Sequence, residues 1–145
     1  MVHKDNDVPS AAMSLTSMMS ISTSGLNAAA TRLEASASNI ANAQSSGPLP
    51  DASGSSTAYQ PLRVTQSDVK GGGVSARLTR VPDPYVTTSD PTSPDANEDG
   101  LVAMPNVDMA GEMVNILTAR MSYEASVKTM KVANDMMKTT LDAFS

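Results

Sequence analysis

The residues that could carry chemistry are few, and the most specific pattern among them is DANEDG at positions 95–100. This pattern matches the opening of a calcium loop, in which alternating carboxylate and amide oxygens bind the ion. The twelfth position of such a loop normally supplies a bidentate glutamate, and here it is Asn106. A helix cannot enter the loop either, because DPTSP precedes it. We favour an acidic turn in which Gly100 adopts a positive φ, with a calcium-binding module over Asp95–Asn106 as the alternative.

Residues suited to acid–base or nucleophilic catalysis are isolated from one another. His3 is the single histidine, and it has no neighbouring residue with which to form a triad or a metal cluster. Asp83 and Asp90 lie in a proline-rich segment without the apolar surroundings that shift a carboxyl pKa. Glu112 and Glu124 are expected on exposed helix surface. We therefore expect no enzyme activity, no cofactor and no small-molecule substrate.

Composition narrows the class of protein further. The net charge of −5 disfavours nucleic acid and anionic lipid as partners, because both need a concentrated basic surface. The 145 residues contain no cysteine, only 3% aromatic residues and eleven methionines, which favours thin helices over a compact core. The N-terminal stretch lacks the apolar segment of a cleaved signal peptide, and no run is long enough to span a membrane.

The positions of the prolines predict two long helices. Prolines are absent between Ser10 and Gly47 and again after Pro105, and proline interrupts helix interiors. We predict a disordered extension over 1–12, an N-terminal helix over 13–46 and a C-terminal helix over 106–145 that together form one coiled-coil domain. Asp108, or Asn106 just before it, can cap the second helix.

A heptad spacing marks the predicted contact face of the N-terminal helix. Met19, Leu26, Leu33 and Ile40 recur at intervals of seven residues, and alanines at 30 and 37 fill the intermediate positions. Apolar residues at this period form the seam of a coiled coil.

A longer apolar stripe runs along the C-terminal helix. Its members alternate at spacings of four and three: Met109, Met113, Ile116, Arg120, Tyr123, Val127, Met130, Asn134, Met137, Leu141 and Phe144. Two of them, Arg120 and Asn134, are polar. They either fix register and partner within the seam or lie at its edge because the stripe is rotated, and the sequence leaves both interpretations open.

The middle region, 47–105, is predicted to contain a linker, short β-strands and a proline-rich loop. LRVTQSDV (62–69) and VSARLTRV (74–81) alternate apolar and polar residues around KGGG, which predicts a hairpin. The following segment, 82–100, is proline- and acid-rich and is expected to be extended or looped. The predicted fold is mainly α, with antiparallel terminal helices pairing as a coiled coil and a small β-hairpin and loop insertion between them.

Two stretches carry a family resemblance. SGLNAAATRLEASASNIANA (24–43) is similar to an "A-x-x-R-L…ASN-[LI]-AN" signature, and DGLVAMPNVDMAGEMVNILTARMSYEAS (99–126) is similar to a "PNVDxxxEMV" signature with a following tyrosine. Both signatures belong to the flagellar basal-body rod proteins of the proximal-rod FlgC type. Arg120 stands one position earlier than the family arginine. The contacts of the family arginine therefore do not carry over directly to this turn of the helix.

The resemblance implies a structural axial subunit of the proximal rod that assembles helically, transmits torque and performs no catalysis. It implies other rod subunits, copies of the same chain and the flagellar type III export apparatus as partners. It also implies export without a cleaved signal peptide and a position in the rod within the periplasm. The alternatives are another rod or hook axial subunit, or a cytoplasmic coiled-coil adaptor or export chaperone.

The residues expected at assembly interfaces combine the seam positions with the motif positions. They are Leu26, Leu33, Asn39, Ile40, Asn42, Asn106, Val107, Asp108, Glu112, Met113, Arg120, Tyr123, Val127, Met130, Asn134, Met137 and Leu141. Asn39 and Asn42 are unusual in a helix, because their amides compete for backbone groups. We expect these amides to satisfy groups of adjoining subunits, the alternative being that they simply end the helix.

Overall fold

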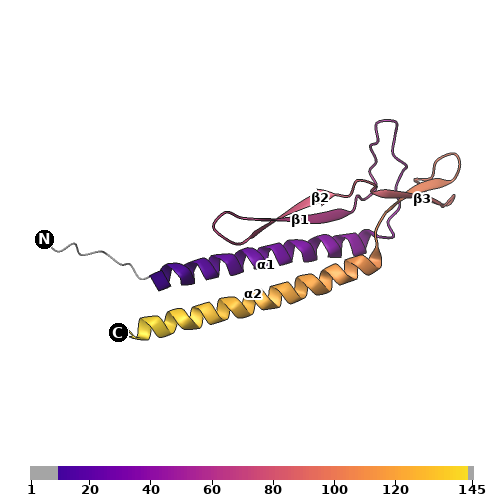
Figure 1. Ribbon diagram of the computed structural model, residues 1–145. Coiled ribbons are helices and arrows are strands. Elements are labelled where there is room, and N and C mark those ends of the chain that lie inside the picture. Colours follow the sequence, from indigo (N-terminus) through magenta and orange to yellow (C-terminus); the bar gives the residue numbers. More distant parts are fainter. Residues whose placement is uncertain (1–9, 144–145) are drawn as a thin grey trace.

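Two long helices form the body of the molecule. The computed structural model describes residues 10–143, and His3 and the rest of 1–9 lie outside the described residues. Helix α1 (Ser10–Asn42) and helix α2 (Met109–Ala143) run antiparallel and side by side along their length (Figure 1). The predicted pairing of the terminal helices is therefore present as an antiparallel pair.

The helix ends differ from the predicted bounds for local reasons. Helix α1 begins at Ser10, inside the predicted extension 1–12, and ends at Asn42 rather than at 46. It ends there because Ser45 donates hydrogen bonds to the Asn42 carbonyl from both its backbone N–H (3.0 Å) and its Oγ (2.7 Å). Asp108 caps α2, because its Oδ1 accepts a hydrogen bond from the Ala110 N–H at 3.1 Å.

The predicted hairpin is present. Strand β1 (Leu62–Asp68) pairs antiparallel with β2 (Val74–Arg80), with Leu62 opposite Arg80. The connecting glycines adopt φ values of 100°, 102° and 98°, a region that only glycine enters readily. This hairpin lies along α1 on the side away from α2 (Figure 1).

The segment 82–100, predicted to be extended or looped, contributes to a second hairpin that the sequence did not indicate. Strand β3 (Tyr85–Ser89) pairs antiparallel with β4 (Leu101–Pro105). The sequence misleads here because its prolines lie before β3, in the connection, or at the last position of β4, where they remove no ladder bond from the strand interiors. Gly47 joins β4 through an isolated bridge to Ala103. This hairpin extends beyond the end of the helix pair (Figure 1).

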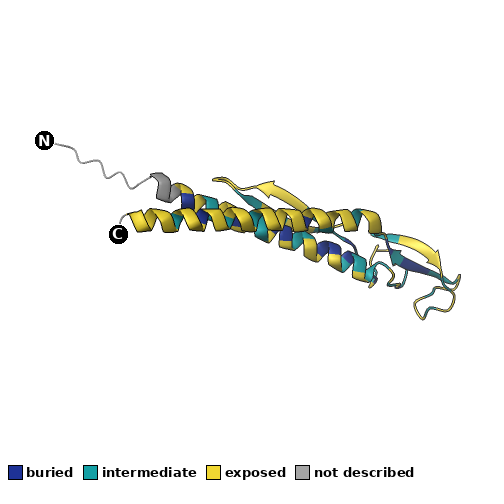
Figure 2. Cartoon of the chain, turned by 90° about the horizontal axis from the view of Figure 1, so that it is seen from below, coloured by how far each residue is buried: buried dark blue, intermediate teal, exposed yellow. Residues whose placement is uncertain are grey.

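The core is thin and built mainly from alanine. The buried apolar residues are Leu15, Ala28, Ala29, Ala35, Ala58, Val102, Ala103, Ala119 and Ala133. Helix α2 is exposed along almost its whole visible face when the chain is seen from below (Figure 2). No helix in the described part of the chain is long and apolar enough to cross a membrane. Burial at about 25 cal/mol per Å² therefore has little apolar side-chain area to act on within one chain.

Candidate functional site

The seam between α1 and α2 is made of smaller residues than the sequence predicts. On α2, Ile116, Met130 and Met137 are half-buried at predicted positions. The intermediate positions are shifted by one residue, so that the α1-facing set is Glu112, Ala119, Ser126 and Ala133 in place of Met113, Arg120, Val127 and Asn134. Ala119 is 1% exposed and Ala133 is 0% exposed, whereas Met113 is 55% exposed. The predicted stripe on α2 is therefore wrong at every second position.

Helix α1 shows the same shift. Its buried heptad is Leu15, Ser22, Ala29 and Ser36, one residue before the predicted alanines at 30 and 37, which are exposed. Leu26 and Ile40 are half-buried, and Leu33 is 43% exposed. A methyl group placed on Gly25 would lie only 2.7 Å from Ser126 Oγ. Small residues on both sides therefore bring the two helices close together.

The shift places large apolar side chains on the face of α2 that points away from α1. Val114 is 61% exposed, Leu117 59% and Met121 71%. We call these three residues, together with Met113, the outer face of α2. Contiguous exposed apolar residues of this size normally mark an interaction surface.

The polar stripe residues lie at the edge of the seam. Arg120 is exposed and pairs with Glu124, four residues on, with 2.9 Å between Nε and Oε1. Asn134 is also exposed. Of the two interpretations that the sequence left open, rotation of the stripe accounts for both residues. The neighbouring Tyr123 and Val127 are 47% and 43% exposed, and Leu141 is 65% exposed.

Asn39 joins both helices to the first hairpin. Its side chain is 1% exposed, and its Nδ2 donates to the Leu62 carbonyl at 2.7 Å and to Glu112 Oε1 at 2.6 Å. Its Oδ1 accepts from the Leu62 N–H at 2.8 Å and from the Tyr59 hydroxyl at 2.9 Å. These four bonds use the full capacity of the amide. Within its own chain Asn39 therefore has a partner for each of its hydrogen-bonding groups, and a contact of Asn39 with an adjoining subunit stays a prediction.

Asn42 differs from Asn39 in its surroundings. Its Nδ2 donates to the Ser38 carbonyl one turn earlier, at 2.9 Å, and the residue is half-buried. The Asn42 Oδ1 has no hydrogen bond among those that the structure gives for it. Asn42 thus ends the helix and keeps a polar group that a neighbouring molecule could reach.

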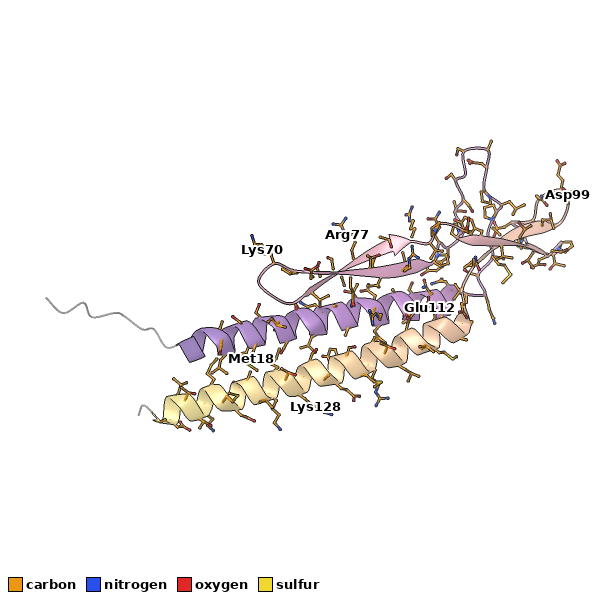
Figure 3. The ribbon with its side chains drawn as sticks, in the orientation of Figure 1. Met18, Lys70, Arg77, Asp99, Glu112 and Lys128 are labelled. Carbon is orange, nitrogen blue, oxygen red and sulfur yellow. The ribbon has the colours of Figure 1, made fainter. Side chains whose placement is uncertain are left out.

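A polar pocket of about 490 Å³ opens beside Asn39, where α1, β1 and α2 meet. Its charged lining includes Arg32, Arg63, Asp108 and Glu112, and Figure 3 shows Glu112 on α2 near this junction. Arg32 donates to Gln66 Oε1 at 2.8 Å. Asn106, on the pocket wall, donates to the Asp83 carbonyl at 3.1 Å, and Val107 beside it is half-buried. The motif residues 106–108 and 112 therefore fix the start of α2 against the hairpins.

The candidate calcium loop is the connection between β3 and β4. Asn97 Oδ1 accepts hydrogen bonds from the N–H groups of Asp99 (3.0 Å) and Leu101 (2.8 Å), so it serves the turn. Gly100 adopts a φ of 72°, as the acidic-turn interpretation requires. Within residues 10–143, no three His, Asp or Glu side chains are grouped as metal ligands would be.

Models of known protein families match the sequence of both helices. The model of the family "Flagella basal body rod protein" matches residues 19–48, and that of "Flagellar basal body rod FlgEFG protein C-terminal" matches residues 98–143. These ranges contain most of α1 and all of α2.

Several curated relatives align over most of their length. Flagellar basal-body rod protein FlgC of Yersinia enterocolitica is 36% identical over 130 residues, which are 89% of this chain and 97% of that protein. The FlgC protein of Salmonella typhimurium is 34% identical over the same shares of both chains. That of Aquifex aeolicus is 29% identical over 91% of this chain and 98% of its own. The chain therefore belongs to the FlgC family of flagellar basal-body rod proteins, and its role is that of a structural subunit of the rod.

Proposed function

We propose that the chain is an axial subunit of the proximal rod that assembles helically with copies of itself and with other rod subunits, and that it transmits torque without catalysis. The outer face of α2 carries this proposal. Leu117 and Met121 are more than half exposed on a helix whose opposite side already packs on α1. A subunit that exposes such residues gains stability when neighbours cover them.

The helix pair would serve as the stiff inner element of the assembly. Small residues at alternating spacings of three and four on both helices support coiled-coil packing. We infer that many shallow contacts, rather than one large interface, hold each subunit. This inference agrees with a core in which alanine is the commonest residue.

We further propose that the flagellar type III apparatus exports the chain and that the rod containing it lies in the periplasm. The sequence contains no cysteine, so a chain passing unfolded through a channel could not become trapped by disulfides. The small apolar core also supports this route, because little buried area must be exposed before passage.

The test replaces Leu117 and Met121 together by glutamate. The variant should be exported and should fold, but it should be missing from purified basal bodies. Cells that carry it should not swim. The matched control is Ser122→Glu, which adds a charge at an exposed position of the same helix outside the outer face. Normal incorporation of the double variant would refute the proposed interface. Recovery of the wild-type chain only from the cytosol would favour an adaptor or export chaperone instead.

A further inference from the structure

The two hairpins carry opposite charge. The segment of β1, β2 and their turn (62–80) contains four basic residues, Arg63, Lys70, Arg77 and Arg80, against the single acid Asp68, which gives a net charge of +3. The segment from 81 to 105, which contains β3 and β4, holds five acidic residues and no basic one, which gives −5. Positive and negative charge are therefore concentrated in different hairpins, although the net charge of the whole chain is −5.

The basic residues lie on an exposed face of the first hairpin, and Arg63 at the edge of that face also lines the polar pocket beside Asn39. Arg63 lies opposite Thr79, and Arg77 lies opposite Thr65, so the two arginines are diagonal neighbours on one face of the two-stranded sheet. Val64 and Ala76, which alternate with them, are half-buried and point the other way. Figure 3 shows Lys70 and Arg77 on the side turned away from α1. We call Arg63, Arg77 and Lys70 the basic face.

The acidic residues project from the connection of the second hairpin. Asp95, Glu98 and Asp99 are all exposed. We call these three residues the acidic tip. Figure 3 shows Asp99 at the far end of the molecule from Lys70. The turn that carries them is held by the Asn97 side chain and by a hydrogen bond from the Gly100 N–H to the Asn97 carbonyl at 2.9 Å.

The two charged surfaces do not neutralise each other within one chain. The ion pair that the structure gives for the described residues is Arg120–Glu124 on α2, which belongs to neither hairpin. Strands β1 and β2 lie beside α1, whereas the β3–β4 hairpin extends past the end of the helix pair (Figure 1). Among the described residues, the charges of the two hairpins therefore stay available for contacts between molecules.

We propose that the acidic tip of one copy docks on the basic face of the first hairpin of a second copy. Complementary patches at two different places on one molecule make a heterologous contact. Repetition of such a contact produces a ring where the rotation closes and an open helical array where it does not. Charge complementarity of this kind sets register and orientation more than affinity. The proposal rests on the helical self-assembly proposed above and names the surface through which the hairpins take part in it.

The first experiment uses single cysteines, which the cysteine-free sequence makes unique. Full-length chains with Ser75→Cys, beside Arg77 on the basic face, and with Pro94→Cys, in the acidic connection, are mixed in equal amounts and oxidised. The mixed 75–94 product should exceed the two homodimeric products taken together, which random pairing of equal amounts would not produce. Its yield should fall steeply between low and high salt because exposed charges are screened. A mixed product no more abundant than the two homodimers together, as random pairing gives, or yields indifferent to salt, would overturn the proposal.

Charge reversal provides the second experiment. Arg63→Glu with Arg77→Glu, or Asp95→Lys with Glu98→Lys, should each lower the 75–94 yield about tenfold, since several modest pairs are lost together. Mixing the two reversed chains should restore the product between them, because each then presents a complement to the other. Lys128→Glu with Lys138→Glu, which changes the same amount of charge on α2, should leave the yield unchanged. Failure of the reversed chains to pair would also overturn the proposal.

The two proposals fail in different ways. If the 75–94 product does not form but incorporation into basal bodies still requires Leu117 and Met121, only the hairpin contact is lost. If the product forms and the glutamate variants at 117 and 121 incorporate normally, the outer face of α2 is not the interface.

Discussion

Replacement of Asn39 by alanine should weaken the chain more than any other single change at the junction. The amide makes four hydrogen bonds of 2.6–2.9 Å at a position that is 1% exposed. Two of its partners, the N–H and C=O of Leu62, lose these hydrogen bonds when the side chain is removed. A buried polar group left unsatisfied costs about 1–3 kcal/mol.

The other two partners lose less. Tyr59 lies 2.9 Å from Ser38 Oγ as well, and Glu112 is half-buried with Asn115 Nδ2 at 3.3 Å from its Oε2. The Leu62 groups therefore dominate, and we expect Asn39→Ala to lower the free energy of unfolding by about 3 kcal/mol.

Urea unfolding followed by circular dichroism measures this loss on the full chain. Asn42→Ala is the matched control, because the same substitution three residues along removes one bond within the helix and should cost about 0.5–1 kcal/mol. Hydrogen exchange adds a local measurement, since the Leu62 amide should lose its protection in the Asn39 variant alone. Equal costs for the two variants would refute the role of Asn39 in holding the hairpin to both helices.

Three further predictions concern other parts of the chain. Gly47→Ala should lower the free energy of unfolding by about 1–3 kcal/mol in the same urea assay, because the added methyl group would lie 2.7 Å from Ala58 Cβ and 2.9 Å from its Cα. Ser46→Ala, at an exposed position, is the control. Equal urea midpoints for the two variants would contradict the close approach of Gly47 to Ala58. Asn42→Ala should impair rod assembly more than it impairs stability, since the Asn42 Oδ1 can bind a neighbour; normal swimming would return Asn42 to a plain helix end. Hydrogen bonds from the Ser53 hydroxyl and the Ser55 N–H lower the pKa of Asp51 below its ordinary value of 3.8. The Asp51 carboxylate therefore holds this turn in place above pH 3.8. The turn loses these hydrogen bonds as the pH falls through the lowered pKa. The Ser55 amide resonance should report that titration, and a midpoint at or above 3.8 would contradict the assigned hydrogen bonds.

The two helices could be predicted from the sequence, but the seam between them could not be predicted in full. The absence of proline located both helices, and the positions of Ile116, Met130 and Met137 were right. The pattern favoured large apolar residues for the remaining positions, whereas the structure buries alanine and serine there. A helix that packs on one neighbour within its chain and on others outside it has two apolar faces, and periodicity alone does not say which faces inward.

The junction was hidden for a different reason. The partners of Asn39 lie 20 to 73 residues away in the sequence, so its role depends on the fold. The available signal was the occurrence of Asn39 and Glu112 in the two family-signature motifs, ASN and EMV, at the two facing helix ends. The β3–β4 hairpin was missed because prolines dominate the composition of its flanks and connection while leaving its strand interiors free.

A cryo-EM map of the purified basal body tests the central claim most directly. We expect this chain within the rod, with α1 and α2 paired and with Leu117 and Met121 covered by a neighbouring subunit. A rod without this chain, or a rod in which the outer face of α2 remains open to solvent, would contradict it.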